Sequence, residues 1–365
     1  MKPADSRNRR HTFLLAALAA ALLAVAVPPA GARPLLKAFW GPDQRNGVSQ
    51  FPVYADLGVD VYQTQLRWDQ IAPVRPVDPE DPGDPAYRWP PGLDRILQEA
   101  SDHRMEVLLM LFGAPPWANG GRPPIWAPDQ PADFAAFATA ASRRYPAVRR
   151  WMIWGEPLRA SNFQPMVPQR KREWARPLTP AQARAPERYA EMLDAAYGAI
   201  RKVDGNAIVI GGNTDTVGDI GVYNWVRYMR LRGGRRPRMD AFGHNPFPLR
   251  RPSLRNPPGP LGSYDVSDLK RLTQLLDKYQ TRGLPIFVSE FTIPTDAPDA
   301  EFNYFATRAV QARWLRAAFR VARRTGRVDG FGWVRLYDEP ALNLHTGLLD
   351  ETGAAKPAYY VFKRE

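Results

Sequence analysis

Eight short apolar runs rich in β-forming residues recur along the chain, and most are separated by stretches with the hydrophobic pattern of amphipathic helices. The runs are Leu35 to Trp40, Val59 to Trp68, Met105 to Phe112, Arg150 to Trp154, Ala207 to Gly212, Met239 to Gly243, Pro285 to Ser289 and Gly330 to Tyr337. Strands that alternate with helices predict a parallel sheet. The stretches Val107 to Phe112 and Ile286 to Val288 are continuously hydrophobic, as expected for strands buried on both faces.

Helices are predicted between the runs, most clearly over Pro131 to Arg144, Pro186 to Val203, Asp265 to Gln280 and Ala300 to Thr325. Eight strand–helix units fit into one α/β domain of this length. We therefore predict a single (β/α)8 TIM barrel over residues 33–365. The sequence shows no solenoid-type repeat and no linker to a second domain.

Three long segments rich in Pro, Asp or Arg follow the second, fourth and sixth runs: Pro73 to Pro91, Leu158 to Pro180 and Phe247 to Gly262. Loops after the strands of such a barrel build its active site, so we expect these segments to form the walls of a cleft. The alternative is that they are exposed insertions, which loops tolerate easily.

The first 32 residues differ from the rest of the chain. Lys2 and three arginines precede an uncharged run from Thr12 to Val27, which is followed by the small residues Ala30, Gly31 and Ala32. This pattern predicts a signal peptide over residues 1–32 that is cleaved after Ala32, and hence a secreted, periplasmic or cell-envelope protein with no stable membrane insertion afterwards. An uncleaved membrane anchor is the alternative, although the apolar run is short for a membrane span.

The composition excludes several kinds of site. No cysteine is present, so a disulfide framework, a thiolate metal site and a cysteine nucleophile are all excluded. The formal net charge of +13 could attract acidic polysaccharide, an anionic envelope or nucleic acid. Because the arginines are dispersed and lack a basic-aromatic RNA motif or zinc-finger spacing, we expect no nucleic-acid partner. Phosphate-loop and calcium-loop spacings are absent, and we expect no metal and no cofactor.

Two glutamates come directly after apolar runs: Glu156 follows the fourth run, and Glu290 follows the seventh. At these places they lie at the loop-bearing end of a barrel, on roughly opposite sides of an eight-stranded ring, and can face each other across a bound sugar. Glycoside hydrolysis needs such a pair: one carboxyl protonates the leaving oxygen, and the other attacks the anomeric carbon or activates water. Their separation distinguishes retention from inversion, and the sequence does not give it.

With these two segments the chain resembles the clan A glycoside hydrolases, in particular the cellulase-like members of families 5 and 39. Residues 151–157, Trp-Met-Ile-Trp-Gly-Glu-Pro, are similar to the strand-four motif Trp-x-x-Trp-Asn-Glu-Pro, whose Glu is the acid/base. The segment that ends in Ser289-Glu290-Phe291 looks like the nucleophile segment. The resemblance covers nearly the whole mature chain and implies a retaining, metal-free reaction in which Glu290 is the nucleophile and Glu156 the acid/base.

Weaker matches support the resemblance. Residues 66–73, Leu-Arg-Trp-Asp-Gln-Ile-Ala-Pro, resemble the clan's strand-two pattern, which implies that Arg67 hydrogen-bonds the nucleophile. Residues 113–118 resemble the turn after strand three, and residues 345–350 resemble the closing segment. Gly332-Trp333 resembles the end of strand eight, which implies that Trp333 forms the floor under the sugar.

The chain departs from the clan at Gly155, where an Asn amide ordinarily contacts the sugar 2-hydroxyl. Hydrogen bonds to that hydroxyl strengthen in the transition state. We consider Asn213, His244 and Asn245 as residues that could supply the missing contact. His244 lies at a predicted strand end, where the resemblance implies an approach to the nucleophile.

Aromatic residues at strand ends are candidate stacking partners for sugar rings, and ordinary core packing is the alternative for each. They are Trp40, Trp117, Trp126, Trp154, Phe247 and Trp333. Among these we assign Trp117 and Trp333 to the cleft.

The sequence therefore predicts a monomeric retaining β-glycoside hydrolase that acts on a poly- or oligosaccharide. A non-catalytic carbohydrate-binding barrel and a transglycosylase are the alternatives. The sugar, the linkage and the choice between exo and endo cleavage stay open.

Overall fold

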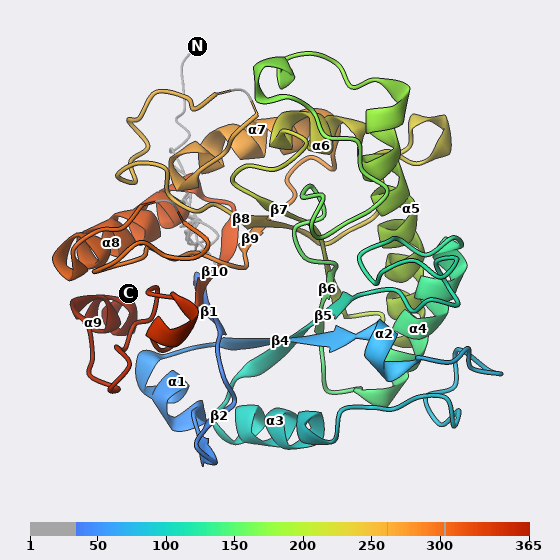
Figure 1. Cartoon of the computed structure of the whole chain (residues 1–365), viewed down its shortest axis with the longest axis horizontal. Helices are drawn as coiled ribbons and strands as arrows, with labels where there is room; N and C mark the ends of the chain where they lie inside the picture. Colours follow the sequence, from blue (N-terminus) through green and yellow to red (C-terminus); the bar gives the residue numbers. More distant parts are fainter. Residues whose placement is uncertain (1–33, 261, 303) are drawn as a thin grey trace, which may run out of the picture. The chain divides into compact units, whose positions relative to one another are not determined.

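Eight parallel strands close into a barrel in the computed structural model, which describes residues 34–260, 262–302 and 304–365 (Figure 1). The strands of the barrel are β1 (Leu36–Trp40), β4 (Val61–Arg67), β5 (Glu106–Phe112), β6 (Arg150–Ile153), β7 (Ile208–Asp215), β8 (Ala241–Asn245), β9 (Ile286–Val288) and β10 (Val328–Val334). They follow one another around the ring in chain order, and β1 pairs with both β4 and β10 to close it. A short antiparallel pair, β2 (Gln44–Arg45) and β3 (Val48–Ser49), follows β1.

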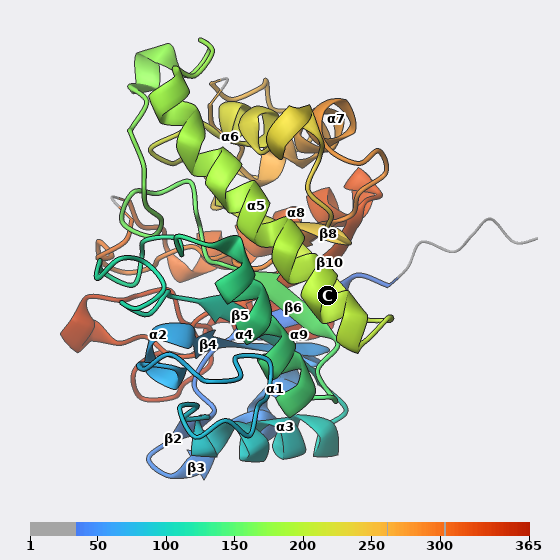
Figure 2. The ribbon, with the colours of Figure 1, turned by 90° about the vertical axis from the view of Figure 1, so that its right-hand side faces the viewer.

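Helices surround the strands in Figure 1. They are α1 (Phe51–Leu57), α2 (Trp68–Ile71), α3 (Pro91–Asp102), α4 (Pro131–Arg144), α5 (Pro180–Val203), α6 (Val222–Tyr228), α7 (Leu269–Tyr279), α8 (Arg308–Thr325) and α9 (Pro357–Arg364), with short 3-10 helices at Lys171–Glu173, Arg232–Gly234, Val266–Asp268 and Pro340–Leu342. The long helix α5 packs along α4, as Figure 2 shows from the side. Thr179 and Thr307 begin α5 and α8, because each side chain accepts a backbone N–H of the first turn.

Two apolar layers stabilise this arrangement. The inner layer fills the barrel and comes from strand side chains that point toward the axis, including Val61, Met110, Met152 and Phe287. The larger outer layer lies between the strands and the surrounding helices. Because strand side chains alternate between the two layers, a shift by one position exchanges a residue that faces the axis for one that faces the helices.

All eight predicted strands are confirmed, with ends that differ by a few residues. The helix predicted over Ala300 to Thr325 began too early: residues 300–302 and 304–307 are not helical, and α8 starts at Arg308 because Thr307 caps it. The helix predicted over Asp265 to Gln280 begins later, at Leu269, and the helix predicted from Pro186 begins earlier, at Pro180 after the Thr179 cap.

The predicted signal peptide, residues 1–32, lies outside the described residues. Among the described residues, no helix combines the length and the apolar character that a membrane span requires.

Candidate active site

Glu156 and Glu290 lie at the same end of the barrel, because Glu156 follows β6, Glu290 follows β9, and both strands run in the same direction. Asn245, the last residue of β8, contacts both segments. Its Nδ2 donates to Glu156 Oε1 at 3.0 Å, and its Oδ1 accepts the backbone N–H of Glu290 at 3.2 Å. The structure therefore brings the two predicted glutamates together, with one buried amide between them.

The backbone around Glu156 is strained. Trp154 has φ 66° and Glu156 has φ 43°, both in the left-handed region that residues with a side chain seldom adopt. The buried Trp154 side chain holds this turn, since its Nε1 donates to Asn162 O at 2.8 Å. Such strain persists only where the surrounding structure enforces it, and it is concentrated at functional sites.

Arg159 lies between two carboxylates. Its Nη1 is 3.1 Å from Glu156 Oε2 and 3.2 Å from Asp215 Oδ2, at the end of β7. Asp215 is buried, and burial raises its pKa well above the usual range; the charge of Glu156 adds to this effect, and Arg159 opposes it. Asn162 Nδ2 also lies 3.4 Å from Glu156 Oε2. The carboxylate of Glu156 therefore has a polar contact on each oxygen.

Glu290 has a different environment. Its side chain is half-buried, and burial raises its pKa to about 8, with smaller contributions from the charges of Glu156 and Glu301; Arg335 and Arg159 oppose the rise. A carboxyl group whose pKa is strongly raised by burial is typical of acid/base sites.

The turn before Glu290 is fixed by contacts with two other strands. Gln63 of β4 donates to Ser289 O at 2.9 Å and accepts from Ser289 Oγ at 3.1 Å, and Trp40 Nε1 donates to the same Oγ at 3.1 Å. On β10, a Cβ at Gly332 would come within 2.0 Å of Ser289 O. The glycine of the Gly332-Trp333 pair is therefore needed for the close approach of β10 to the Glu290 turn.

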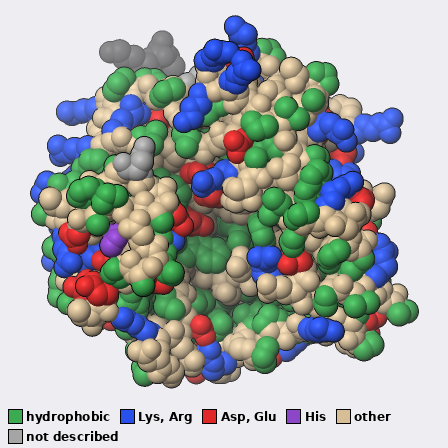
Figure 3. Space-filling model, in the orientation of Figure 1, with side chains coloured by type: hydrophobic (Ala, Val, Ile, Leu, Met, Phe, Trp, Pro, Cys, Tyr) green, Lys and Arg blue, Asp and Glu red, His purple; other side chains and the backbone are tan. Residues whose placement is uncertain are grey.

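The face of the molecule seen in Figure 1 is hollowed at its centre, with charged side chains around a floor of hydrophobic ones (Figure 3). At the ends of β1 and β10 a hollow of about 360 Å³ is lined by Trp40, Arg335 and Tyr337, among other residues. Trp40 keeps part of its surface exposed, and its Nε1 donates to Ser289 next to Glu290, so it is placed to meet a ligand near Glu290.

Two predicted contacts to the nucleophile are not formed. Arg67 binds Asp69 instead, through Nε and Nη2, both at 2.9 Å, because the carboxylate two residues on satisfies the guanidinium fork locally. His244 is fully buried, and its ring lies between Thr214 Oγ1 at 2.8 Å and Tyr264 O at 2.9 Å. Burial lowers the pKa of His244 to about 4, so it is a neutral residue that joins β7, β8 and the following loop.

Of the two tryptophans assigned to the cleft, Trp333 needs correction, whereas Trp117 keeps part of its surface exposed. Trp333 is 0% exposed, packs against Phe291 in the outer layer, and therefore offers no free ring face to a sugar. Trp117 donates to Ala72 O at 2.8 Å and packs edge-on against Trp68, while the Arg75 guanidinium lies 4.6 Å from its ring centre. Core packing and Arg75 therefore occupy much of the surface that was expected to bind sugar.

Asn213 lies next to Gly155. A Cβ at Gly155 would lie 4.0 Å from Asn213 Nδ2 and 3.1 Å from Met110 Sδ. Asn213 Nδ2 donates to Trp154 O at 3.2 Å, while its Oδ1 is buried and has no hydrogen-bond partner among the described residues. The side chain of Asn213 therefore occupies the neighbourhood into which a residue-155 side chain would point.

Two residues of the site were not predicted from the sequence, Arg159 and Asp215. The strand end could have indicated Asp215, because β7 continues to Asp215 instead of stopping at Gly212. Arg159 gives no comparable signal, since its two partners lie three and 56 residues away along the chain. Among residues 34–260, 262–302 and 304–365, no three His, Asp or Glu side chains form a group that could hold a metal ion.

The fold and the position of the two carboxylates define a class: closed parallel (β/α)8 barrels with acidic residues at the carboxyl ends of the strands. No protein-family model and no curated protein matches the sequence. Solved structures do match.

The chain is similar to a family 39 glycoside hydrolase from Bacteroides cellulosilyticus, with 15% identity over 91% of this chain and 63% of that one, at a TM-score of 0.62. A glucosidase from Croceicoccus marinus shares 16% identity over 91% and 65%, at a TM-score of 0.63. A monomeric β-xylosidase from Caulobacter crescentus shares 16% over 90% and 66%, at 0.59. The chain thus spans just under two thirds of these proteins' length, and at this identity the likeness establishes the fold.

Proposed function

We propose that the protein is a retaining β-glycoside hydrolase in which Glu290 attacks the anomeric carbon and Glu156 protonates the leaving oxygen. The observation that carries this proposal is the Asn245 bridge, which joins the carboxylate of Glu156, after β6, to the backbone N–H of Glu290, after β9. The solved structures that share the fold are described as a family 39 glycoside hydrolase, a glucosidase and a β-xylosidase, which supports the same reaction class.

In the first step Glu290 forms a bond to the anomeric carbon while the bond from that carbon to the leaving oxygen breaks. The leaving oxygen takes the proton of Glu156. In the second step Glu156 removes a proton from water, which displaces Glu290 and releases the sugar. Asn245 has two functions in this scheme. It orients Glu156 through Nδ2, and it fixes the backbone of Glu290 through Oδ1.

Arg159, which contacts both Glu156 and Asp215, can shift from Glu156 toward Asp215 when a substrate binds. A leaving oxygen that approaches Glu156 competes with Arg159 for Oε2, and Arg159 keeps a second carboxylate, Asp215, at 3.2 Å. Arg159 therefore keeps a carboxylate partner in Asp215 when Glu156 takes up a proton and its own contact with Arg159 weakens. Removing Asp215 leaves Arg159 with one carboxylate, so Asp215→Asn should slow the protonation of poor leaving groups more than of good ones.

The test is hydrolysis of a panel of aryl β-glycosides by the wild type and three variants. Glu290→Gln should abolish turnover of every substrate. Glu156→Gln should reduce turnover of poor leaving groups by about 10²–10⁴-fold and spare activated ones, because only the former need a proton. Product configuration followed by NMR should show retention.

Glu191→Gln is the matched control, because Glu191 is half-buried and also has an arginine three residues away, with Arg188 Nη1 at 3.3 Å. It should behave as the wild type. Wild-type turnover in Glu290→Gln would refute the assignment of the nucleophile. No turnover of any substrate by the folded wild type, together with measurable sugar binding, would favour a non-catalytic binding barrel.

A further inference from the structure

A second hollow lies outside the barrel end described above, between the loop that joins β8 to α7 and the outer face of α8. Its volume is about 490 Å³. The loop contributes residues 251–256, and α8 contributes Ala317, Arg320, Val321 and Arg324. Among the described residues that line it, the charged side chains are all arginines: Arg251, Arg255, Arg320 and Arg324.

These four arginines are exposed, and within residues 34–260, 262–302 and 304–365 none of their side chains forms an ion pair or hydrogen bond. Neighbouring arginines behave differently. Arg250 binds Asp265 at 3.0 Å and Asp268 at 3.1 Å, and Arg271 binds Asp268 at 3.0 Å. In this region Arg250 and Arg271 reach carboxylates, whereas the four arginines that line the hollow do not.

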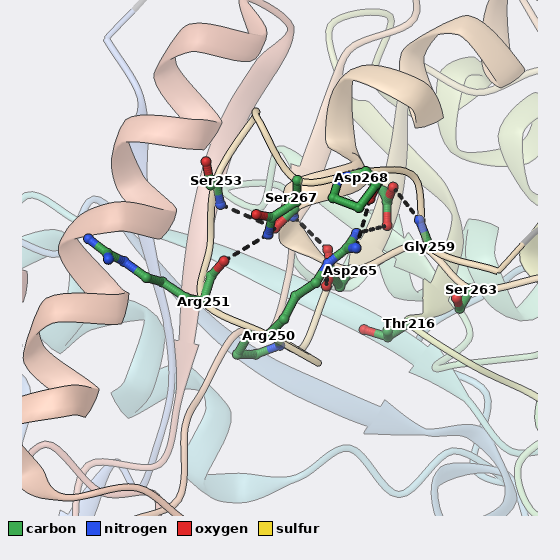
Figure 4. Close-up of polar contacts among 12 residues, drawn as sticks. Thr216, Arg250, Arg251, Ser253, Gly259, Ser263, Asp265, Ser267 and Asp268 are labelled. Carbon is green, nitrogen blue, oxygen red and sulfur yellow. Dashed lines mark hydrogen bonds and ion pairs between the residues drawn. The ribbon is translucent and has the colours of Figure 1, made fainter.

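The loop is held in a defined position by polar contacts, shown in Figure 4. Besides the pairs of Arg250, Ser267 Oγ accepts the backbone N–H of Ser253 at 3.2 Å, and Asn256 Nδ2 donates to Arg251 O at 2.8 Å. Arg251 points away from this network in the same view. The arginines of the loop are thus presented from a fixed backbone.

The arginines of helix α8 lower its stability. Arg320 and Arg324 are one turn apart, and like charges at this spacing destabilise a helix. No acidic residue occurs anywhere in α8. An anionic ligand would remove this repulsion, and guanidinium groups bind carboxylate and sulfate oxygens through paired N–H donors.

We propose that this hollow binds the anionic groups of an acidic polysaccharide chain. Leu254, Ala317 and Val321 give it an aliphatic floor, which suits the apolar C–H faces of sugar rings, while the arginines surround that floor. Among the described residues that line it, none has an aromatic side chain of the kind on which nucleic-acid bases stack. The choice of a polysaccharide rests on the proposed function; the anionic character of the ligand does not.

The test is calorimetric titration of the protein with an oligogalacturonate hexamer, with cellohexaose as the neutral probe of equal length and a short DNA duplex as another polyanion. We expect binding of the galacturonate and none of cellohexaose. Arg320→Gln combined with Arg324→Gln should raise the Kd about tenfold or more, because two charge-assisted contacts are lost. Arg251→Gln with Arg255→Gln should do the same from the loop side.

The matched control is Arg170→Gln with Arg232→Gln, which removes the same charge from exposed arginines outside the hollow. Its Kd should stay within about twofold of the wild type, apart from general screening. An equal loss in control and hollow variants would overturn the proposal, as would tighter binding of DNA with the same dependence on Arg320 and Arg324.

Turnover of an aryl β-glycoside, measured on the same samples, separates this proposal from the proposed function. Arg320→Gln with Arg324→Gln should leave that turnover unchanged. Normal turnover without galacturonate binding would overturn the hollow as a site, whereas galacturonate binding without any turnover would refute the glycosidase and keep the anionic site.

Discussion

The raised pKa of Glu290 predicts an unusual pH dependence for substrates whose leaving group needs no proton. If Glu290 is the nucleophile, it must be ionised, and a pKa of about 8 means that about 1% is ionised at pH 6, about 10% at pH 7 and half at pH 8. For a dinitrophenyl β-glycoside, kcat/KM should rise about tenfold from pH 6 to 7, about fivefold further to pH 8, and level off above about pH 9.

The structure also predicts how the midpoint moves. The charges of Glu156 and Glu301 raise the pKa of Glu290, so Glu156→Gln and Glu301→Gln should shift the midpoint to lower pH. Arg335 opposes the rise, so Arg335→Gln should shift it to higher pH. Glu191→Gln, which changes a glutamate on α5, should leave the midpoint in place.

The assay is initial-rate kinetics at limiting substrate, with the leaving phenol followed by absorbance and corrected for spontaneous hydrolysis at each pH. A dinitrophenyl rate that is flat from pH 6 to 9, or that moves in the wrong direction in Glu156→Gln, would refute this reasoning.

Three further predictions follow from the same site. Glu290→Gln should raise the Tm relative to the wild type by an amount that grows from pH 5 to 9. Because the pKa of Glu290 is raised in the folded state, ionisation of the wild-type carboxyl destabilises the fold as the pH rises from the ordinary glutamate range through about 8. A difference in Tm that does not change with pH in calorimetric scans would contradict this prediction. Asn245→Ala should lower kcat/KM by an amount equivalent to about 1.5–3 kcal/mol of transition-state stabilisation, since a hydrogen bond to the Glu156 carboxylate is lost. Asn245→Gln should not restore kcat/KM, because its longer side chain places the amide elsewhere. If Asn213 replaces the amide absent at Gly155, Asn213→Ala should lower kcat strongly in the wild type but weakly in Gly155→Asn, and a double-mutant cycle with no coupling would show that it does not.

The sequence pattern predicted the architecture well, because the hydrophobic side chains that make a strand or a helix are local and periodic. All eight strands and the position of Glu156 and Glu290 after β6 and β9 follow from that pattern together with the direction of parallel strands. The helix boundaries that were missed, at Thr179 and Thr307, depend on capping contacts of single side chains.

The pattern did not predict which side chain at a strand end reaches the site. His244 and Asn245 are neighbours on β8, and the one expected to approach the nucleophile is buried on the other side of the strand, while the next one contacts both glutamates. In β7 the register shifts between Gly211 and Thr214, and this irregularity sets Asp215 beside Asn245. A one-residue change of phase reverses every side chain that follows, and no local periodicity encodes it.

The sequence by itself therefore determined the barrel, its order of strands and the two acidic residues at the carboxyl end of its strands. Only the tertiary structure decided the partners of those residues: Asp69 for Arg67, Asp215 and Glu156 for Arg159, and Asn245 for both glutamates. The physical reason is distance along the chain. Strand and helix patterns arise between near neighbours, whereas Asn245 and Glu156 are 89 residues apart and meet only because the barrel closes.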